Sequence, residues 1–159
     1  LKILPGTCVA DLGAGGGYFT FRLAEAVGPR GKVYAVDIDR EALDVIAQHT
    51  REKEINNVEV VLPTENDPRL ADRNIDLIFS CNTVHHLHNR IAYFQNLARS
   101  LRSGGRIPII DYTPTCFAWL FGHGTAKETI RKEMEAAGYR LIDDFGYLSK
   151  QHFQVVRYE

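Results

Sequence analysis

Cysteine is scarce in this sequence, and neither a disulfide framework nor a structural metal site is indicated. The three cysteines, Cys8, Cys81 and Cys116, are an odd number, and no two of them form a C-x-x-C pair. This pattern is typical of reduced thiols in a cytoplasmic protein rather than of a secreted scaffold or a zinc site. We therefore expect a cytoplasmic protein without a metal ion.

An excess of charge of either sign is also missing. The 19 Lys and Arg residues nearly balance the 20 Asp and Glu residues, and the formal net charge is −1. A nearly neutral chain has no field that would draw it onto nucleic acid or anionic lipid. No apolar run approaches the length that spans a bilayer, and no signal peptide is visible. Neither a nucleic-acid partner nor an integral membrane contact is expected.

The length of the chain, 159 residues, suits one domain with one core. A domain of this size buries roughly two-thirds of the surface that its unfolded chain exposes. No repeat, linker or low-complexity segment divides the sequence, so residues 1–159 are expected to form a single domain. The first strand pattern begins only about seven residues after Leu1, from which we expect an N-terminal segment to be missing.

A glycine-rich loop, residues 13–17, lies between a short apolar strand pattern at 8–10 and an amphipathic helix pattern. Glycine permits positive φ angles and close approach of a ligand, and the first N–H groups of the helix point at what binds there. The alternative is a plain tight turn, which does not require four glycines that each cost roughly 0.5–1 kcal/mol relative to alanine. We expect a nucleotide-like ligand, with these residues as its contacts: Asp11, Gly13, Ala14, Gly15, Gly17 and Tyr18.

The glycine spacing distinguishes two kinds of nucleotide. A dinucleotide-binding fingerprint needs G-x-G-x-x-G, and Tyr18 occupies the position of its third glycine. Asp11, just before the loop, would repel a pyrophosphate, yet it would attract a cofactor that carries an ammonium group and a sulfonium. The sequence therefore favours a cationic cofactor.

An acidic residue follows the next strand pattern. Asp37 comes directly after the apolar run 32–36, where a carboxylate can accept hydrogen bonds from both hydroxyls of a ribose. Ile38 would then pack on the adenine face. The alternative for Asp37 is the role of an acid at a helix start, because Asp and Glu favour first turns. Asp39 is the expected N-cap of the helix that follows.

Strand and helix patterns continue to the end of the chain. Further strands are expected at 58–62, 75–80 and 107–112, and the closing runs 139–145 and 152–158 predict an antiparallel pair at a sheet edge. Three local features carry predictions of their own. Gly104 and Gly105 should end a helix, Thr125 and Glu128 should form a capping box, and Pro108 should mark a bulge or an N–H position that faces away from its neighbour.

Four segments resemble the motifs of the class I S-adenosylmethionine-dependent methyltransferases, in the family's order and spacing. VADLGAGGGYFT is similar to the first cofactor motif, and VYAVDID to the acidic motif after the second strand. NIDLIFSCNTVHHL is similar to the fourth-strand motif, and LRSGGRIPIIDY to the fifth strand with its glycine turn. The resemblance covers nearly the whole chain. It implies an α/β fold with a doubly wound, mostly parallel seven-stranded sheet whose last strand is antiparallel, and S-adenosylmethionine as the cofactor.

The resemblance also suggests contacts beyond the glycine loop. Family members place a polar side chain near the adenine after the third strand, where this chain has Glu65 and Asn66, although a solvated loop explains them equally well. Asn82 follows the fourth strand, where an open parallel sheet presents residues to its cleft. We expect Asn82 to contact the cofactor or the acceptor, and Cys81 to be packed.

His85 and His86 are candidate catalytic bases. Their loop lies over the expected position of the methyl group, and imidazole titrates near neutral pH. The alternative is that either ring satisfies loop carbonyls, and His123 has the same ambiguity. A metal site is not expected, because adjacent histidines project in different directions on most backbones. The most apolar loop, residues 117–121, would suit a hydrophobic or aromatic acceptor as well as a place in the core.

Three classes of function remain to be weighed. The first is an S-adenosylmethionine-dependent methyltransferase that moves a methyl group to a small molecule by in-line displacement. The second is a nicotinamide-dependent oxidoreductase, which Tyr18, Asp11 and the absence of a Y-x-x-x-K pair disfavour. The third is a non-catalytic cofactor-binding domain. The motifs of family members that methylate adenine or glutamine amino groups, or cytosine, are absent, so a small-molecule acceptor is expected; no feature indicates an oligomeric state.

Overall fold

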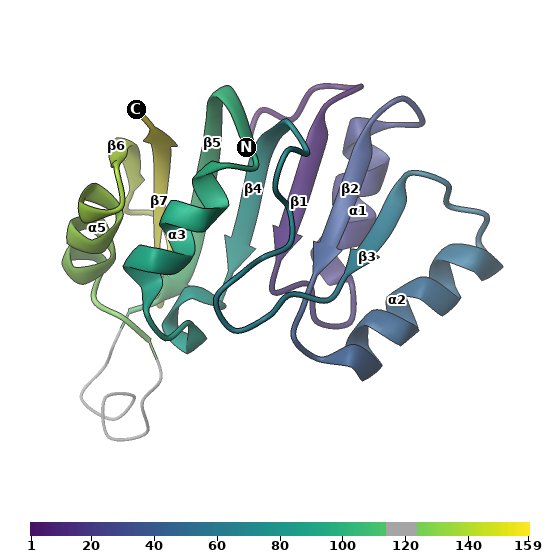
Figure 1. The fold of residues 1–159 in the computed structure, drawn as a ribbon, viewed down its shortest axis with the longest axis horizontal. Helices are drawn as coiled ribbons and strands as arrows, with labels where there is room; N and C mark the ends of the chain where they lie inside the picture. The colour runs from purple at the N-terminus through teal and green to yellow at the C-terminus, as the bar shows by residue number, and fades with distance from the viewer. Residues whose placement is uncertain (114–123) are drawn as a thin grey trace.

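The computed structural model describes residues 1–113 and 124–159, and seven of its strands form one twisted sheet (Figure 1). The strand order is β3-β2-β1-β4-β5-β7-β6. The strands have the following bounds: β1 Cys8–Leu12, β2 Lys32–Val36, β3 Val58–Val61, β4 Ile75–Cys81, β5 Leu101–Tyr112, β6 Tyr139–Phe145 and β7 Gln151–Tyr158.

The first five strands are parallel, and β7 runs antiparallel to both of its neighbours. The expected doubly wound sheet with an antiparallel last strand is therefore confirmed. The chain leaves β1 toward β2 and β3 on one side, then returns to β4 on the other side of β1. Ligands of open parallel sheets bind beyond the carboxyl ends of the strands at such a reversal. The fold thus places a binding cleft beyond Leu12, Val36 and Cys81.

Helices cover both faces of the sheet. Side chains of successive strand residues point to opposite faces, so Leu77 and Ile78 identify the two layers. Leu77 packs with residues of α1 (Tyr18–Val27), whereas Ile78 packs with residues of α3 (Arg90–Ala98) and α5 (Lys127–Ala136). In Figure 1, α1 accordingly lies behind the sheet and α3 and α5 lie in front of it. The remaining long helix is α2, Arg40–Glu52, whose buried side chains pack on the cluster that contains Ala35.

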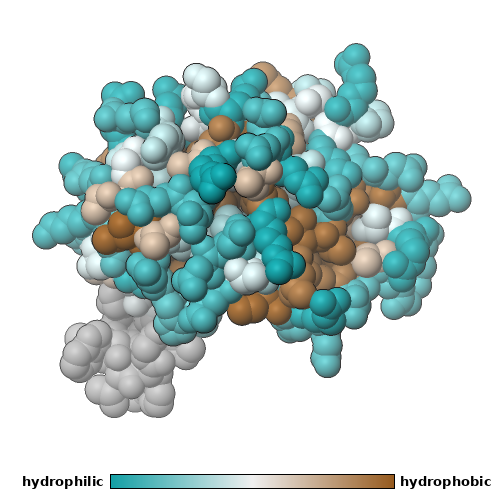
Figure 2. All heavy atoms as spheres, viewed as in Figure 1, coloured by the Kyte–Doolittle hydropathy of each residue, from teal (hydrophilic) through white to brown (hydrophobic). Residues whose placement is uncertain are grey.

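No helix connects β3 to β4. The described residues 62–74 form an irregular segment that is anchored by the fully buried side chain of Leu70. The front face near the carboxyl ends of β1 and β2 is therefore bordered by a loop on one side and by α3 on the other. Figure 2 shows apolar surface on this face between the regions of α3 and α2.

Two local predictions were wrong, and so was one of the two alternatives given for Pro108, a bulge; the other, an N–H position that faces away from its neighbour, stays a prediction. α3 ends at Ala98, before the glycines, and Gly104 and Gly105 lie inside β5, where the register with β4 shifts between Ile75 and Leu77. The pairing continues without a shift from Leu77 to Cys81, so the bulge lies before Pro108 and not at it. The N-cap of α5 is Ala126 with no side-chain cap, so Thr125 and Glu128 form no capping box. Thr125 instead has a long-range contact, because His152 Nε2 of β7 lies 3.1 Å from its carbonyl oxygen.

Candidate functional site

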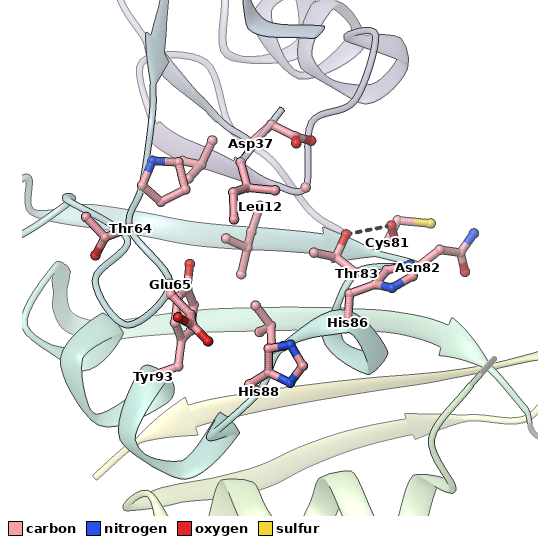
Figure 3. A pocket seen from close by; sticks show the side chains of 15 residues that line it. Leu12, Asp37, Thr64, Glu65, Cys81, Asn82, Thr83, His86, His88 and Tyr93 are labelled. Atoms are coloured by element: carbon pink, nitrogen blue, oxygen red, sulfur yellow. Dashed lines mark hydrogen bonds between the residues drawn. The ribbon is translucent and has the colours of Figure 1, made fainter. Parts of the chain in front are cut away.

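A cleft of about 370 Å³ opens beyond the carboxyl ends of β1, β2, β3 and β4. This volume lies in the range of roughly 300–1,000 Å³ that is typical of small-molecule sites. Figure 3 shows Asp37 on one side of the cleft and His86 and His88 on the other. Six residues that the sequence proposed as site residues line it: Gly13, Asp37, Ile38, Glu65, Asn82 and His86.

Gly13 is required by both its backbone angle and its surroundings. Its φ of +79° lies in the left-handed region, and its N–H donates to the Val36 carbonyl oxygen at 2.8 Å. A Cβ atom at this position would collide with the Thr83 side chain, which comes from the loop after β4. The absence of a side chain therefore lets the glycine loop approach the loop after β4. The resulting space is the kind of cradle that fits a cofactor held against bare backbone.

Asp37 is bonded to the glycine loop. Its Oδ2 atom accepts a hydrogen bond from the Gly15 N–H at 2.7 Å, and its Oδ1 atom accepts one from the Asp39 N–H at 2.9 Å. Each oxygen of an ionised carboxylate can accept more than one hydrogen bond, so both retain capacity for hydroxyl donors. Asp39 is the N-cap of α2, as expected, and its side chain accepts from the N–H groups of Glu41 and Ala42. The carboxylate of Asp37 is thus held in place at the cleft.

Asp11 lies below the cleft and does not line it. The residue is 2% exposed, and its Oδ2 atom accepts a hydrogen bond of 2.6 Å from the Thr20 hydroxyl. Burial raises the pKa of Asp11 from 3.8 to about 6; the charge of Asp37 adds to this effect and the Thr20 hydrogen bond opposes it. At neutral pH Asp11 therefore carries a negative charge beneath the glycine loop.

The raised pKa of Asp11 predicts a pH-dependent stability difference between the wild type and Asp11→Asn. Between pH 4 and pH 6 the folded state holds a proton that the unfolded state has lost, so the contribution of Asp11 to stability falls as pH rises through this window. We expect the wild-type free energy of unfolding, relative to that of the variant, to decrease by roughly 2–3 kcal/mol from pH 4 to pH 7. Urea titrations of both proteins at each pH measure this decrease in the free energy of unfolding. A difference that does not change with pH would contradict this assignment.

Asn82 has a strained backbone beside the cleft. Its φ is +56°, a conformation that asparagine tolerates better than most residues. Its N–H donates to the Ile110 carbonyl oxygen at 2.8 Å, and its Oδ1 accepts from Gln151 Nε2 at 2.6 Å. Gln151 was not identified from the sequence, because only the pairing of β5 with β7 brings the first residue of β7 to this loop. Asn82 is thus held in a fixed orientation.

Cys81 lines the cleft and also packs against the α1 side of the core. Burial, with a smaller contribution from the charges of Asp11 and Asp111, raises the pKa of its thiol to about 11. Cys81 therefore remains a neutral thiol at physiological pH and is a poor nucleophile. Cys8, the other cysteine in the described ranges, is in the first position of β1, at the opposite end of the sheet.

The two adjacent histidines have different environments. His86 is exposed and lines the cleft. The His85 side chain is only 4% exposed; its Nδ1 atom lies 2.6 Å from Asp111 Oδ1, and its backbone N–H donates to Asp111 Oδ2 at 2.9 Å. The two rings are in contact, with centroids 3.9 Å apart and planes tilted by 43°. Asp111 was missed in the sequence, although an acidic residue at the end of an apolar strand is itself unusual.

The remaining predicted site residues do not line the cleft. Tyr18, exposed at the start of α1, stacks with the guanidinium of Arg22, and Ala14 is buried beneath the loop. The carbonyl oxygen of Asn66 accepts a hydrogen bond from Asn96, and Asn66 does not line the cleft. Gly15 and Gly17 keep positive φ angles. Residues 117–121, Cys116 and His123 lie outside the described ranges.

Among the described residues, no group of three His, Cys, Asp or Glu side chains is placed to hold a metal ion. None of the helices in residues 1–113 and 124–159 is long and apolar enough to cross a bilayer.

Comparison with known proteins identifies the class. A family model described as a methyltransferase domain matches residues 3–153, so the chain belongs to this family, the class I S-adenosylmethionine-dependent methyltransferases. A crystal structure of a SAM-dependent methyltransferase from Aquifex aeolicus superposes with a TM-score of 0.87 and 25% identity, covering 98% of this chain and 84% of the other. The family, the fold class and S-adenosylmethionine as the family cofactor are therefore confirmed.

Relatives whose names give a reaction are longer than this chain. The chain is 32% identical over 111 residues to an arsenite methyltransferase of Halobacterium salinarum, covering 70% of this chain and 28% of the relative. It is 29% identical over 146 residues to a ubiquinone/menaquinone biosynthesis C-methyltransferase of Shewanella frigidimarina, covering 91% of this chain and 54% of the relative. The chain thus spans between about a quarter and about half of the length of these relatives.

Proposed function

We propose that the protein transfers a methyl group from S-adenosylmethionine to a small-molecule acceptor by in-line displacement. The observation that carries the proposal is the position of the Asp37 carboxylate. It accepts a hydrogen bond from the Gly15 N–H and lies at the cleft that Gly13 also lines. When bound, S-adenosylmethionine supplies a methyl carbon activated by its sulfonium. Asp37 accepts the ribose hydroxyls, and Ile38, 73% exposed at the rim, packs on the adenine. Glu65 lines the same cleft, and its carboxylate accepts a hydrogen bond from the adenine amino group.

The other side of the cleft receives the acceptor. His86 removes a proton from acceptors that lose one on methylation, and Asn82 positions the nucleophile. From beneath the glycine loop, the negative charge of Asp11 attracts the positively charged end of the cofactor. The other contacts predicted from the sequence surround this site: Ala14, Gly17, Tyr18 and Asn66. We also propose a cytoplasmic location.

An uncharged organic acceptor fits the cleft better than arsenite, although relatives of both kinds are known. Trivalent arsenic is thiophilic, and a soft centre requires several convergent thiolates. Of the described residues lining the cleft, Cys81 alone is a cysteine, and its raised pKa keeps it protonated. On the side of the cleft that carries His86, the apolar side chain of Leu87 suits a hydrophobic or aromatic acceptor.

Thermal unfolding with candidate ligands tests the proposal. A ligand at 100 times its dissociation constant stabilises the folded state by about 2.7 kcal/mol, which for a domain of this size raises the melting temperature by roughly 5–10 °C. S-adenosylmethionine and S-adenosylhomocysteine are expected to produce this shift, and NAD is not. A shift with NAD alone would favour the oxidoreductase.

Substitution at Asp37 provides the matched control for this experiment. Asp37→Ala is expected to lower the affinity for S-adenosylhomocysteine at least about tenfold, because the ribose hydroxyls lose a charged acceptor. Asp39→Ala removes only the N-cap of α2, so it should cost about 1 kcal/mol of stability and leave the affinity nearly unchanged. If calorimetry shows that the two substitutions lower the affinity for S-adenosylhomocysteine equally, Asp37 is only an acidic residue at a helix start.

A screen of acceptor classes decides between catalysis and binding alone. The purified protein is incubated with S-adenosylmethionine and panels of quinones, phenols, amines, thiols and arsenite, and mass spectrometry detects the added methyl group. A methylated organic product supports the proposal. Tight cofactor binding without transfer to any panel would favour the non-catalytic alternative.

A further inference from the structure

Asp111 is a fully buried carboxylate to which the proposed function so far assigns no role. The residue is near the end of β5 and is 0% exposed. Within the described part of the chain, its two oxygens accept hydrogen bonds from the backbone N–H of His85 at 2.9 Å, from the ring of the same residue at 2.6 Å, and from the Tyr112 N–H at 2.8 Å. A buried carboxylate is costly unless its acceptors are satisfied. This carboxylate is satisfied mainly by a single residue of another loop.

These hydrogen bonds determine which ring nitrogen of His85 carries a proton. An ionised carboxylate only accepts hydrogen bonds, so the Nδ1 atom that faces Asp111 must be the donor. The backbone and ring bonds together hold both ends of the residue, and neither the position of its Cα nor the orientation of its ring can change independently. Asp111 therefore locks the conformation of His85.

The locked residue is the centre of the turn that borders the cleft. The short helix η1 (Val84–His86) is closed by a hydrogen bond of 2.9 Å from the His86 N–H to the Thr83 carbonyl oxygen. On one side of His85, the Thr83 side chain lies against Gly13 of the glycine loop. On the other side, the His86 ring contacts the His85 ring, and His86 lines the cleft.

We infer that Asp111 is a positioning residue of this methyltransferase site: through His85, it holds the η1 turn so that the His86 imidazole faces the acceptor side of the cleft. The inference rests on the proposed function for its catalytic meaning, but the geometry that it asserts belongs to the protein alone. Asp111 itself does not line the cleft. Its substitution should therefore displace His86 without removing any group that contacts a ligand.

The first test needs neither cofactor nor acceptor. In Asp111→Asn the amide NH₂ replaces one acceptor oxygen and faces one of the His85 donors, so the hydrogen-bond pattern cannot be kept. We expect the ¹⁵N NMR spectrum of the wild type to show a proton on His85 Nδ1, and the variant to shift the ring resonances of both His85 and His86. If the asparagine variant does not fold, Asp111→Ser is measured, with the same expectation.

A partly buried aspartate on the neighbouring strand β4 gives a control. Asp76 is near the start of β4, at the end of the sheet away from the cleft, and its Oδ2 accepts a hydrogen bond from the Cys8 N–H at 2.7 Å. Asp76→Asn should lower stability but leave the resonances of both histidines at their wild-type positions. Histidine resonances that stay unchanged in a folded Asp111 variant, or that respond equally to Asp76→Asn, would overturn the inference.

A double-mutant cycle tests the functional part with the acceptor found by the screen. Asp111→Asn is expected to lower the turnover number at least about tenfold, while the affinity for S-adenosylhomocysteine changes less than about threefold. In a His86→Gln background the same substitution should cause no further loss, because its effect passes through His86. Additive losses would show a separate role and overturn the inference. Absence of methyl transfer in the wild type would instead be a failure of the proposed function. The NMR comparison would then still test whether Asp111 positions the two histidines.

Discussion

Gly13→Ala is expected to weaken the binding of S-adenosylhomocysteine at least about 100-fold. A residue with a side chain costs roughly 1–2 kcal/mol in the left-handed region, and the new Cβ would also collide with Thr83. The free protein relieves this strain by moving the glycine loop or the loop after β4. Binding must then restore the original geometry, and this cost appears as lost affinity. Calorimetry on the folded variant measures the loss.

Gly28→Ala is the control for this substitution. Gly28 has a φ of +66° at the end of α1, away from the cleft, and no atom lies within 4 Å of the position of its Cβ. It should therefore destabilise the fold by a similar backbone effect and leave the cofactor affinity nearly unchanged. If the two alanine variants bind S-adenosylhomocysteine equally well, Gly13 has no special place in the cofactor site.

His86→Gln is expected to lower the turnover number by roughly 10² to 10⁴, with cofactor affinity almost unchanged. Glutamine retains hydrogen-bonding groups, but it does not take up a proton near neutral pH. The acidic limb of the pH–rate profile should therefore disappear together with the loss in rate. Steady-state kinetics with the acceptor from the screen, and calorimetry with S-adenosylhomocysteine, measure the two quantities.

His88→Gln is the matched comparison, because His88 lines the same cleft from the same loop. Only the His86 variant should lose the acidic limb. Inhibition of the wild type by a chelator would instead indicate a metal held by the histidines. Full activity in the His86 variant would mean that methyl transfer depends on the position of the nucleophile alone, since S-adenosylmethionine already carries an activated methyl group.

Much of the fold could be predicted from local patterns. Residues 32–36 and 139–145 form strands with the expected bounds, and Asp39 caps α2, because strand periodicity and helix capping depend on neighbours in the sequence. The failures also have a common cause. Glycines that look like a helix stop form the shifted start of β5, where Gly105 lies close to the Ile75 carbonyl oxygen of the adjacent strand. The packing of two strands outweighed a weak local preference.

The sequence by itself determined the family, the order of strands and helices, the glycine loop and the acidic residue that follows β2. These features depend on local periodicity, backbone angles and the spacing of short motifs. Only the tertiary structure decided that Thr83 lies against Gly13, that Gln151 holds Asn82, and that His85 is bound to Asp111 while His86 faces the cleft. Each of these contacts joins residues far apart in the chain. Strand order and register bring them together, and both depend on pairing between strands that are distant in the sequence.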